Sequence, residues 1–196
     1  GVEALMRELG ARAAVSEPVV KAHGKLFTFA AGANLADWGA RDGRVEGGFV
    51  TVPGVFSADG PDRGSMLLAA ALPAAMPGRG VDLGAGWGYL SAAALLRAGV
   101  LHLDLVEACA DALACARRNV TDARADFHWA DATAFRPARP ADWVVCNPPF
   151  HAGRDADPAL GEGFLRAAAR MLAPQGSLWL VANRHLPYDR TLASLF

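Results

Sequence analysis

The chain has 196 residues, of which 53% are hydrophobic and 20% are charged. This length and hydrophobic content are enough for one well-buried domain with a small appendage, and the charged fraction argues against general disorder. Its net charge of −1 does not indicate an extended nucleic-acid surface, and no stretch reaches the roughly 18 apolar residues of a membrane span, so we expect a soluble, cytoplasmic protein. An odd number of cysteines without metal-ligand spacing predicts neither a disulfide framework nor a metal site; they are Cys109, Cys115 and Cys146.

The first 76 residues predict short elements of mixed type. This part of the chain contains apolar residues at helical spacing and runs in which apolar and polar residues alternate, and glycine-rich breaks separate them. The expected elements are a helix over residues 2–9, a strand over 25–29, an irregular connection over 32–43, a hairpin over 44–57 and an Ala/Leu-rich helix over 59–76.

From residue 80 onward, apolar strand-like runs alternate with helical stretches. The expected strands are 80–83, 100–106, 125–129, 142–146 and 176–182, and the expected helices are 87–97, 109–119 and 158–172. Alternation of this kind predicts an α/β fold, a Rossmann-like, doubly wound and mainly parallel sheet covered on both faces. Ligands of such sheets bind at the carboxyl ends of the strands.

The first strand of this series ends in a glycine-rich turn that contains Gly84, Gly86 and Gly88, with Asp82 two residues upstream. The spacing is Gly-x-Gly-x-Gly, which differs from the Gly-x-Gly-x-x-Gly fingerprint of dinucleotide pyrophosphates. A ligand without phosphates does not require the third glycine of that fingerprint, and an acid beside the loop can meet a cationic amino group. This pattern favours S-adenosylmethionine, although a tight turn of this kind can also bind nothing.

Two carboxylates follow the next two strands. Glu107 lies at the tip of the second strand, where a carboxylate can accept hydrogen bonds from both ribose hydroxyls of an adenosine-containing ligand, or can cap a helix. Asp131 follows the third strand and could bind the adenine amino group. Three histidines have no partners at catalytic spacing, which favours ordinary packing or exposure; they are His23, His102 and His128.

The segment Asn147-Pro-Pro-Phe150 at the end of the fourth strand is the sharpest signal. Two prolines remove backbone donors and stiffen the loop, so the carbonyl of Pro148 and the side-chain oxygen of Asn147 can accept hydrogen bonds from one planar NH2 group. Phe150 offers a stacking face for the group that carries the amine. We expect catalysis mainly by alignment for in-line methyl transfer, without a covalent intermediate.

These motifs resemble class I S-adenosylmethionine-dependent methyltransferases that modify amino groups. More narrowly, the chain resembles the bacterial ribosomal RNA small-subunit guanine-(N2)-methyltransferases in three segments that follow one another in the family's order. These segments are Pro53 to Ser65, Asn147 to Gly153 and Val181 to Tyr188. The resemblance implies ribosomal RNA or the ribosomal subunit as partner, with no membrane and no metal. It implies that the guanine is held by Asn147, Pro148 and Phe150, and that the cofactor is surrounded by Asp82, Gly84, Ala85, Gly86, Glu107, Asp131, Ala132 and Asn147, with Phe56 and Ser57 closing the pocket.

The same resemblance predicts the domain organisation. The family has two methyltransferase-like domains, of which the N-terminal one has lost its cofactor motifs and assists RNA binding. Residues 1–45 are expected to be a small α+β remnant, the tail of that first domain, and residues 46–196 to be the catalytic domain. The family's final antiparallel hairpin is expected to be missing after the fifth strand.

Two other functions remain open from the sequence. A protein glutamine N-methyltransferase also positions an NH2 group, and related enzymes use Asn-Pro-Pro-Tyr, whereas Phe150 and the downstream Leu186-Pro-Tyr188 segment favour a nucleobase. A catalytically silent RNA-binding module is the third possibility, against which the intact Asp82 and Glu107 argue.

Overall fold

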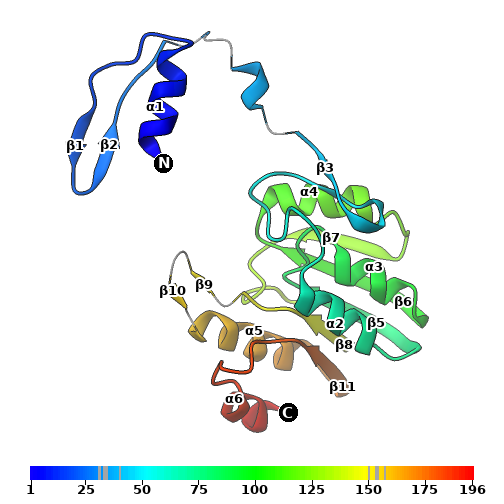
Figure 1. Ribbon diagram of the computed structural model, residues 1–196. Helices are drawn as coiled ribbons and strands as arrows, with labels where there is room; N and C mark the ends of the chain where they lie inside the picture. The colour runs from blue at the N-terminus through cyan, green and yellow to red at the C-terminus, as the bar shows by residue number, and fades with distance from the viewer. Residues whose placement is uncertain (31, 33–34, 40, 150, 153–154, 157) are drawn as a thin grey trace. The chain divides into compact units, whose positions relative to one another are not determined.

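The computed structural model describes residues 1–196 except 31, 33–34, 40, 150, 153–154 and 157. It divides into two compact units, Gly1–Arg41 and Asp42–Phe196 (Figure 1). The division falls between residues 41 and 42, whereas the sequence suggested a boundary between residues 45 and 46.

The described residues of the first unit form an α-helix, a hairpin and a short 3-10 helix. Helix α1 (Val2–Gly10) is followed by the antiparallel strands β1 (Val19–Lys21) and β2 (Gly24–Leu26) and by the short 3-10 helix η1 (Ala36–Trp38). The predicted strand over 25–29 is therefore wrong in its bounds, and its partner β1 was not predicted. The turn between β1 and β2 places Ala22 and His23 at φ 49° and 63°, the left-handed conformation that joins tightly paired strands.

The second unit is built on a five-stranded parallel sheet, as predicted. Its strands lie in the order β11-β8-β5-β6-β7, with β11 and β7 at the two edges. Their bounds are β5 (Ala75–Leu83), β6 (Ala98–Glu107), β7 (Ala125–Trp129), β8 (Ala141–Cys146) and β11 (Leu172–Leu180). The chain runs outward from β5 through β6 to β7 and then returns to β8, so the direction of the strand order reverses between β5 and β8. This reversal is where open parallel sheets bind ligands.

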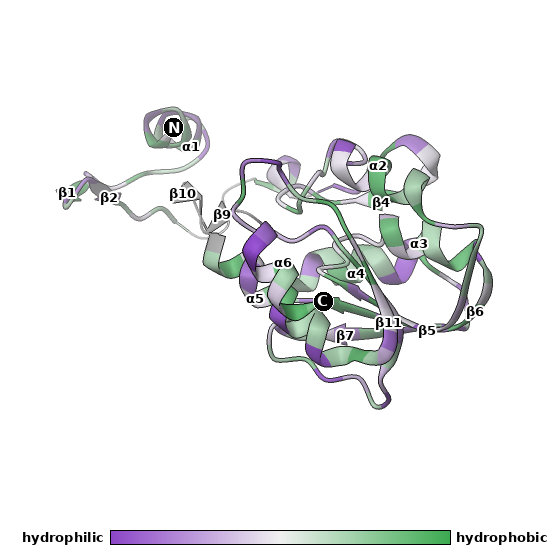
Figure 2. Ribbon diagram, turned by 90° about the horizontal axis from the view of Figure 1, so that it is seen from below, coloured by the Kyte–Doolittle hydropathy of each residue, from purple (hydrophilic) through white to green (hydrophobic). Residues whose placement is uncertain are grey.

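Helices cover both faces of this sheet. One face carries α2 (Arg63–Ala71), α3 (Tyr89–Leu95) and α4 (Ala110–Asn119), whose apolar residues pack with Leu103 and Leu105 of β6. The other face carries α5 (Pro158–Met171), which packs on alternate residues of β5 and β8, and α6 (Asp189–Leu195) contacts α5. The helices show both hydrophobic and hydrophilic residues in Figure 2, as expected for elements with one face in the core.

Helix α2 is shorter than the sequence predicted, because both ends of the expected 59–76 helix are cut off. Asp62 is the N-cap, with its side chain accepting from the backbone N–H of Ser65, so the helix begins at Arg63. Pro73 disfavours helical backbone at the preceding residue, and Leu72 has the extended ψ of 136°. Residues 75 and 76 belong to β5 instead.

The remaining elements are short or were not expected. The predicted hairpin over 44–57 is reduced to β3 (Gly43–Arg44), the 3-10 helix η2 (Glu46–Gly48) and β4 (Val50–Thr51), since the chain turns away into the Pro53–Asp62 segment. A two-residue pair, β9 (His151–Ala152) with β10 (Asp155–Ala156), and helix α6 were not predicted.

Candidate functional site

The glycine loop and the Asn-Pro-Pro loop lie side by side at the carboxyl ends of neighbouring strands. Leu83 of β5 pairs with Cys146 of β8, so Gly84 and Asn147 leave the sheet next to each other. A cavity of about 390 Å³ opens at this point, within the size range of small-molecule sites. It is lined by Phe56, Gly84, Gly86, Val106, Glu107, Ala108, Asp131, Ala132, Asn147, Pro148, Pro149, Leu160 and Phe164.

The glycine loop has a backbone conformation that other residues adopt poorly. Gly84, Gly86 and Gly88 have φ values of 75°, 55° and 93°. The N–H groups of Gly84 and Ala85 donate to the carbonyl of Val106, each at 3.0 Å, which ties the loop to β6. A Cβ built at Gly86 would meet no described atom within 4 Å. The loop is thus fixed on its sheet side and open at Gly86, which leaves room for a ligand.

Glu107 is held by the loops on both sides of it. Its Oε2 accepts from the N–H of Gly86 at 2.8 Å, and its Oε1 accepts from the N–H of Cys109 at 2.7 Å. A carboxylate has about four acceptor positions, so these two bonds leave capacity on both oxygens. Glu107 lines the cavity and therefore combines support of the glycine loop with the capacity to bind a ligand.

Asp131 lines the same cavity, and its carboxylate is oriented by its own loop. Oδ1 accepts from both the backbone N–H and the hydroxyl of Thr133, each at 2.8 Å. This arrangement fixes the carboxylate at the cavity edge, with Ala132 buried beside it.

Three predicted cofactor residues, Asp82, Ala85 and Ser57, do not line this cavity, and Asp82 is the most deeply buried of them. Its side chain is fully buried beneath the glycine loop, and it does not line the cavity. Ser91 of α3 donates to its Oδ2 at 2.6 Å, while its Oδ1 has no described hydrogen-bond partner. Burial raises the pKa of Asp82 to about 7, the hydroxyl of Ser91 lowers it, and the nearby charge of Glu107 raises it.

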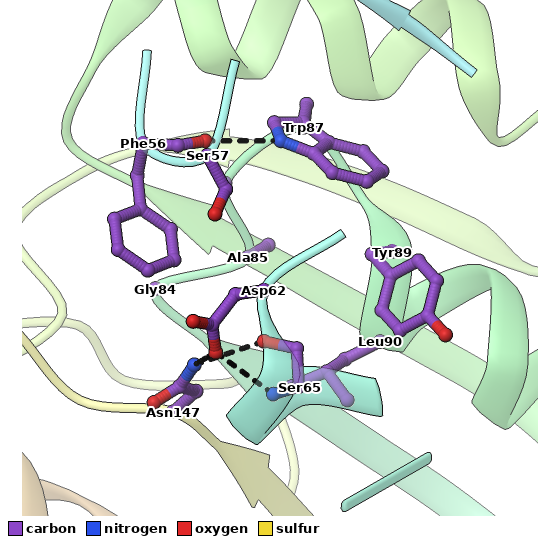
Figure 3. Close-up of a pocket in the computed structure, with 11 residues that line it drawn as sticks. Phe56, Ser57, Asp62, Ser65, Gly84, Ala85, Trp87, Tyr89, Leu90 and Asn147 are labelled. Carbon is purple, nitrogen blue, oxygen red and sulfur yellow. Dashed lines mark hydrogen bonds between the residues drawn. The ribbon is translucent and has the colours of Figure 1, made fainter. Parts of the chain in front are cut away.

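Phe56 and Ser57 lie on a loop that a hydrogen bond ties to the glycine loop, and Phe56 lines the cavity. The indole N–H of Trp87 donates to the carbonyl of Phe56 at 3.0 Å, and Ser57 has the left-handed φ of 54° (Figure 3). The side chain of Phe56 lines the cavity and the residue is 61% exposed. An exposed aromatic ring at the mouth of a cavity is a surface that a ligand can cover.

Asn147 is fixed by two residues at the start of α2. Its side-chain NH2 donates to Oδ2 of Asp62 at 3.0 Å and to the hydroxyl oxygen of Ser65 at 2.9 Å (Figure 3). Pro148 is buried and Pro149 is exposed, and both line the cavity. Phe150, the third predicted substrate residue, lies outside the described residues.

The structure adds site residues that the sequence analysis did not single out. Asp62 and Ser65 fall inside the Pro53 to Ser65 segment, so the motif contained a signal for them. Leu160 and Phe164 of α5 line the cavity, and no spacing in the sequence marks them, because they arrive through packing of α5 against the sheet.

The structure also gives His102 and His128 partners. The Nε2 atoms of both lie within hydrogen-bond distance of Oδ1 of Asp104, at 3.1 Å and 2.7 Å, and Asp126 lies beside His102. This cluster lies on β6 and β7 and does not line the cavity. Within the described ranges, no helix is both long and apolar enough to cross a membrane.

Comparison with known proteins gives consistent matches. The family model of the methyltransferase small domain matches residues 46–196. The ribosomal RNA small subunit methyltransferase C of Salmonella arizonae is 35% identical over 147 residues, and that of Sodalis glossinidius is 36% identical over 148 residues. Each match covers 74% of this chain, but only 43% and 42% of the respective relative, so the chain spans less than half the length of these proteins.

Among solved structures, the T. thermophilus 16S rRNA N2 methyltransferase RsmC, in complex with AdoMet and guanosine, superposes with a TM-score of 0.79 at 26% identity. The superposition covers 100% of this chain and 57% of that one.

Proposed function

This chain belongs to the methyltransferase small domain family, and we propose on that premise that it transfers a methyl group from S-adenosylmethionine to the exocyclic N2 amine of a guanine in small-subunit ribosomal RNA. The observation that carries the proposal is one cavity lined both by the glycine loop with Glu107 and by Asn147 with Pro148. Direct methyl transfer between two bound molecules requires that the site for the methyl donor and the loop that holds the amine share one cavity.

The residues present fit S-adenosylmethionine. The open space at Gly86 lets a ligand approach the backbone closely, and the remaining acceptor capacity of Glu107 suits two ribose hydroxyls. Asp131 would accept from the adenine amino group, and Ala85, Ala132, Phe56 and Ser57 would close around the cofactor. When bound, this cofactor supplies a sulfonium methyl group as the electrophile. Asp82 would act indirectly, through Ser91 and the loop above it.

Asn147 and Pro148 would hold the acceptor amine. Both present carbonyl-type oxygens, and two acceptors that bind the two N–H groups of one amine direct the nitrogen lone pair out of the plane toward the methyl donor. Phe150, two residues after Pro148 in the sequence, would stack on the base. The partner that supplies this base would be small-subunit ribosomal RNA, as the names of the relatives suggest.

Methyl transfer from radiolabelled S-adenosylmethionine to small-subunit ribosomal RNA, both naked and assembled, tests the proposal. Asn147→Ala should lower turnover by about 10²-fold or more through lost alignment, with nearly unchanged cofactor affinity. Gln175→Ala, which removes an exposed amide from the amino-terminal half of β11, is the matched control and should retain wild-type turnover.

Two results would replace the proposal by another function. Label on protein glutamine with blank RNA would identify the glutamine methyltransferase alternative. Calorimetry without any heat of binding for S-adenosylmethionine would identify a silent RNA-binding module.

A further inference from the structure

We propose that Asp62 and Ser65 are positioning residues, which lock the side-chain amide of Asn147 so that only its oxygen, Oδ1, is presented to the substrate. The inference rests on the proposed function for its chemical meaning, because it specifies which kind of group the cavity accepts. Its basis is the hydrogen-bond geometry at the junction of α2 and the Asn-Pro-Pro loop (Figure 3).

Both hydrogens of the Asn147 amide have acceptors on α2. One N–H direction is taken by Oδ2 of Asp62 at 3.0 Å, and the other by the hydroxyl oxygen of Ser65 at 2.9 Å. Ser65 is buried and Asp62 is partly buried, so water competes weakly for these bonds. With its donors occupied, the amide has only the acceptor Oδ1 to offer a substrate.

Asp62 and Ser65 contribute differently to this lock. If the amide were flipped, Oδ1 would face the carboxylate of Asp62, which has only acceptors when ionised, and the pair would repel. Ser65 could tolerate either orientation, because a hydroxyl both donates and accepts. Asp62 therefore decides the orientation, whereas Ser65 supports it.

Asp62 is itself held in place by the helix that it caps. The same Oδ2 that accepts from Asn147 also accepts from the N–H of Ser65 at 2.9 Å. A charged acceptor at a helix N-terminus is stabilised by the helix dipole and the free N–H groups. Because Asp62 is fixed to the first turn of α2, the position of this helix determines where the amide of Asn147 is held.

The chemical consequence is selection at the atom that binds Asn147. A substrate group that donates N–H, such as the exocyclic amine of a base, matches Oδ1. A substrate carbonyl placed there would face an acceptor and lose its hydrogen bonds, a mismatch that sites with fixed polar groups reject strongly. The lock thus favours an amine over a carbonyl on the edge of the same base.

Nuclear magnetic resonance of the substrate-free 196-residue chain tests the orientation directly. The sequence has four asparagines, so selective 15N-asparagine labelling gives few side-chain NH2 pairs, and Asn147→Ala identifies the relevant one by its loss. We expect slow hydrogen exchange for this pair in the wild type and at least about 10-fold faster exchange in Asp62→Asn. Equal exchange rates in the two proteins would overturn the lock.

Steady-state kinetics test whether the fixed orientation of the Asn147 amide contributes to turnover. Asp62→Asn retains a good N-cap residue but permits either amide orientation, so it should lower kcat by about 10-fold or more with an unchanged cofactor Kd. Ser65→Ala should have a smaller effect. Ala69→Gly weakens the same helix without touching Asn147, so it should retain the wild-type kcat.

The outcomes separate the two proposals. Wild-type kcat in Asp62→Asn, or an equal fall in Ala69→Gly, would overturn the positioning role. A protected amide in a wild-type protein that methylates no ribosomal RNA would instead leave the lock intact and contradict the proposed function.

Discussion

Glu107 combines a structural role with a place in the cavity wall. Its carboxylate joins the glycine loop to the start of α4 through the N–H groups of Gly86 and Cys109, and it also lines the cavity. Glu107→Ala should weaken binding of S-adenosylmethionine by about 1.5 to 3 kcal/mol, roughly 10- to 150-fold in Kd, because charge-assisted bonds are lost. Isothermal titration calorimetry measures this change. Glu46→Ala removes an exposed carboxylate elsewhere and should bind normally, and unchanged affinity in Glu107→Ala would contradict the assignment.

Asp82 should leave a mark on the pH dependence of stability. Its carboxyl has a pKa of about 7 when folded, because burial disfavours the charged form, against an ordinary value of 3.8. Between these values the native state keeps a proton that the unfolded chain has lost. The stability contributed by this group therefore falls as pH rises from about 4 to 7, by up to about 1.4 kcal/mol per pH unit.

Asp82→Asn replaces the titrating carboxyl by an amide that does not ionise. The free energy of unfolding of the variant, relative to wild type, should consequently rise with pH across the same window, as measured by urea unfolding at several pH values. Asp111→Asn, at an exposed position, should show no such trend. A difference between Asp82→Asn and wild type that stays constant from pH 4 to 7 would disprove the raised pKa.

Among the elements, α4 anchors the segment that carries Phe56 and Ser57. Asn119 at the last residue of α4 accepts from the N–H of Val50 at 2.7 Å and donates to the carbonyls of Val50 and Trp87, each at 2.8 Å. Asn119→Ala should lower the free energy of unfolding by about 2 to 3 kcal/mol, since each bond contributes about 1 kcal/mol. It should also weaken cofactor binding, because the segment that carries Phe56 loses one of its anchors, at Val50.

Urea unfolding and calorimetry on the same preparation measure both effects of Asn119→Ala. Gln175→Ala is again the amide control and should leave both quantities unchanged. If Asn119→Ala loses stability but keeps its cofactor affinity, the link from α4 to the Phe56 loop is wrong.

At the scale of the whole molecule, every described residue that lines the cavity belongs to the second unit, Asp42–Phe196. A shortened chain of residues 42–196 should therefore keep its sheet and bind S-adenosylmethionine within about 2-fold of the Kd of the 196-residue chain, because its core and its cavity are internal to that unit. Circular dichroism and calorimetry check this expectation. Loss of cofactor binding in a shortened chain that is still folded would show that the first unit contributes to the site.

The sequence by itself determined the parallel sheet and the two loops of the site, because these depend on local patterns. Runs of apolar residues gave β5, β6, β7 and β8, and the residues that follow β5 and β8 had to emerge at the same edge of a parallel sheet. Local signals failed where two of them competed. The apolar spacing over 59–76 suggested one long helix, but the cap at Asp62 and the backbone restriction before Pro73 limited it to α2.

Only the tertiary structure decided how the site residues are oriented. The contact of Asn147 with Asp62 joins positions 85 residues apart, and that of Trp87 with Phe56 joins positions 31 apart, so no local pattern reports them. The sequence placed Asp82 beside the cofactor because it precedes the glycine loop, whereas the alternation of strand residues puts its side chain beneath that loop, against Ser91. Sequence spacing shows which residues reach the end of a sheet, and packing between distant segments sets the direction in which their polar atoms point.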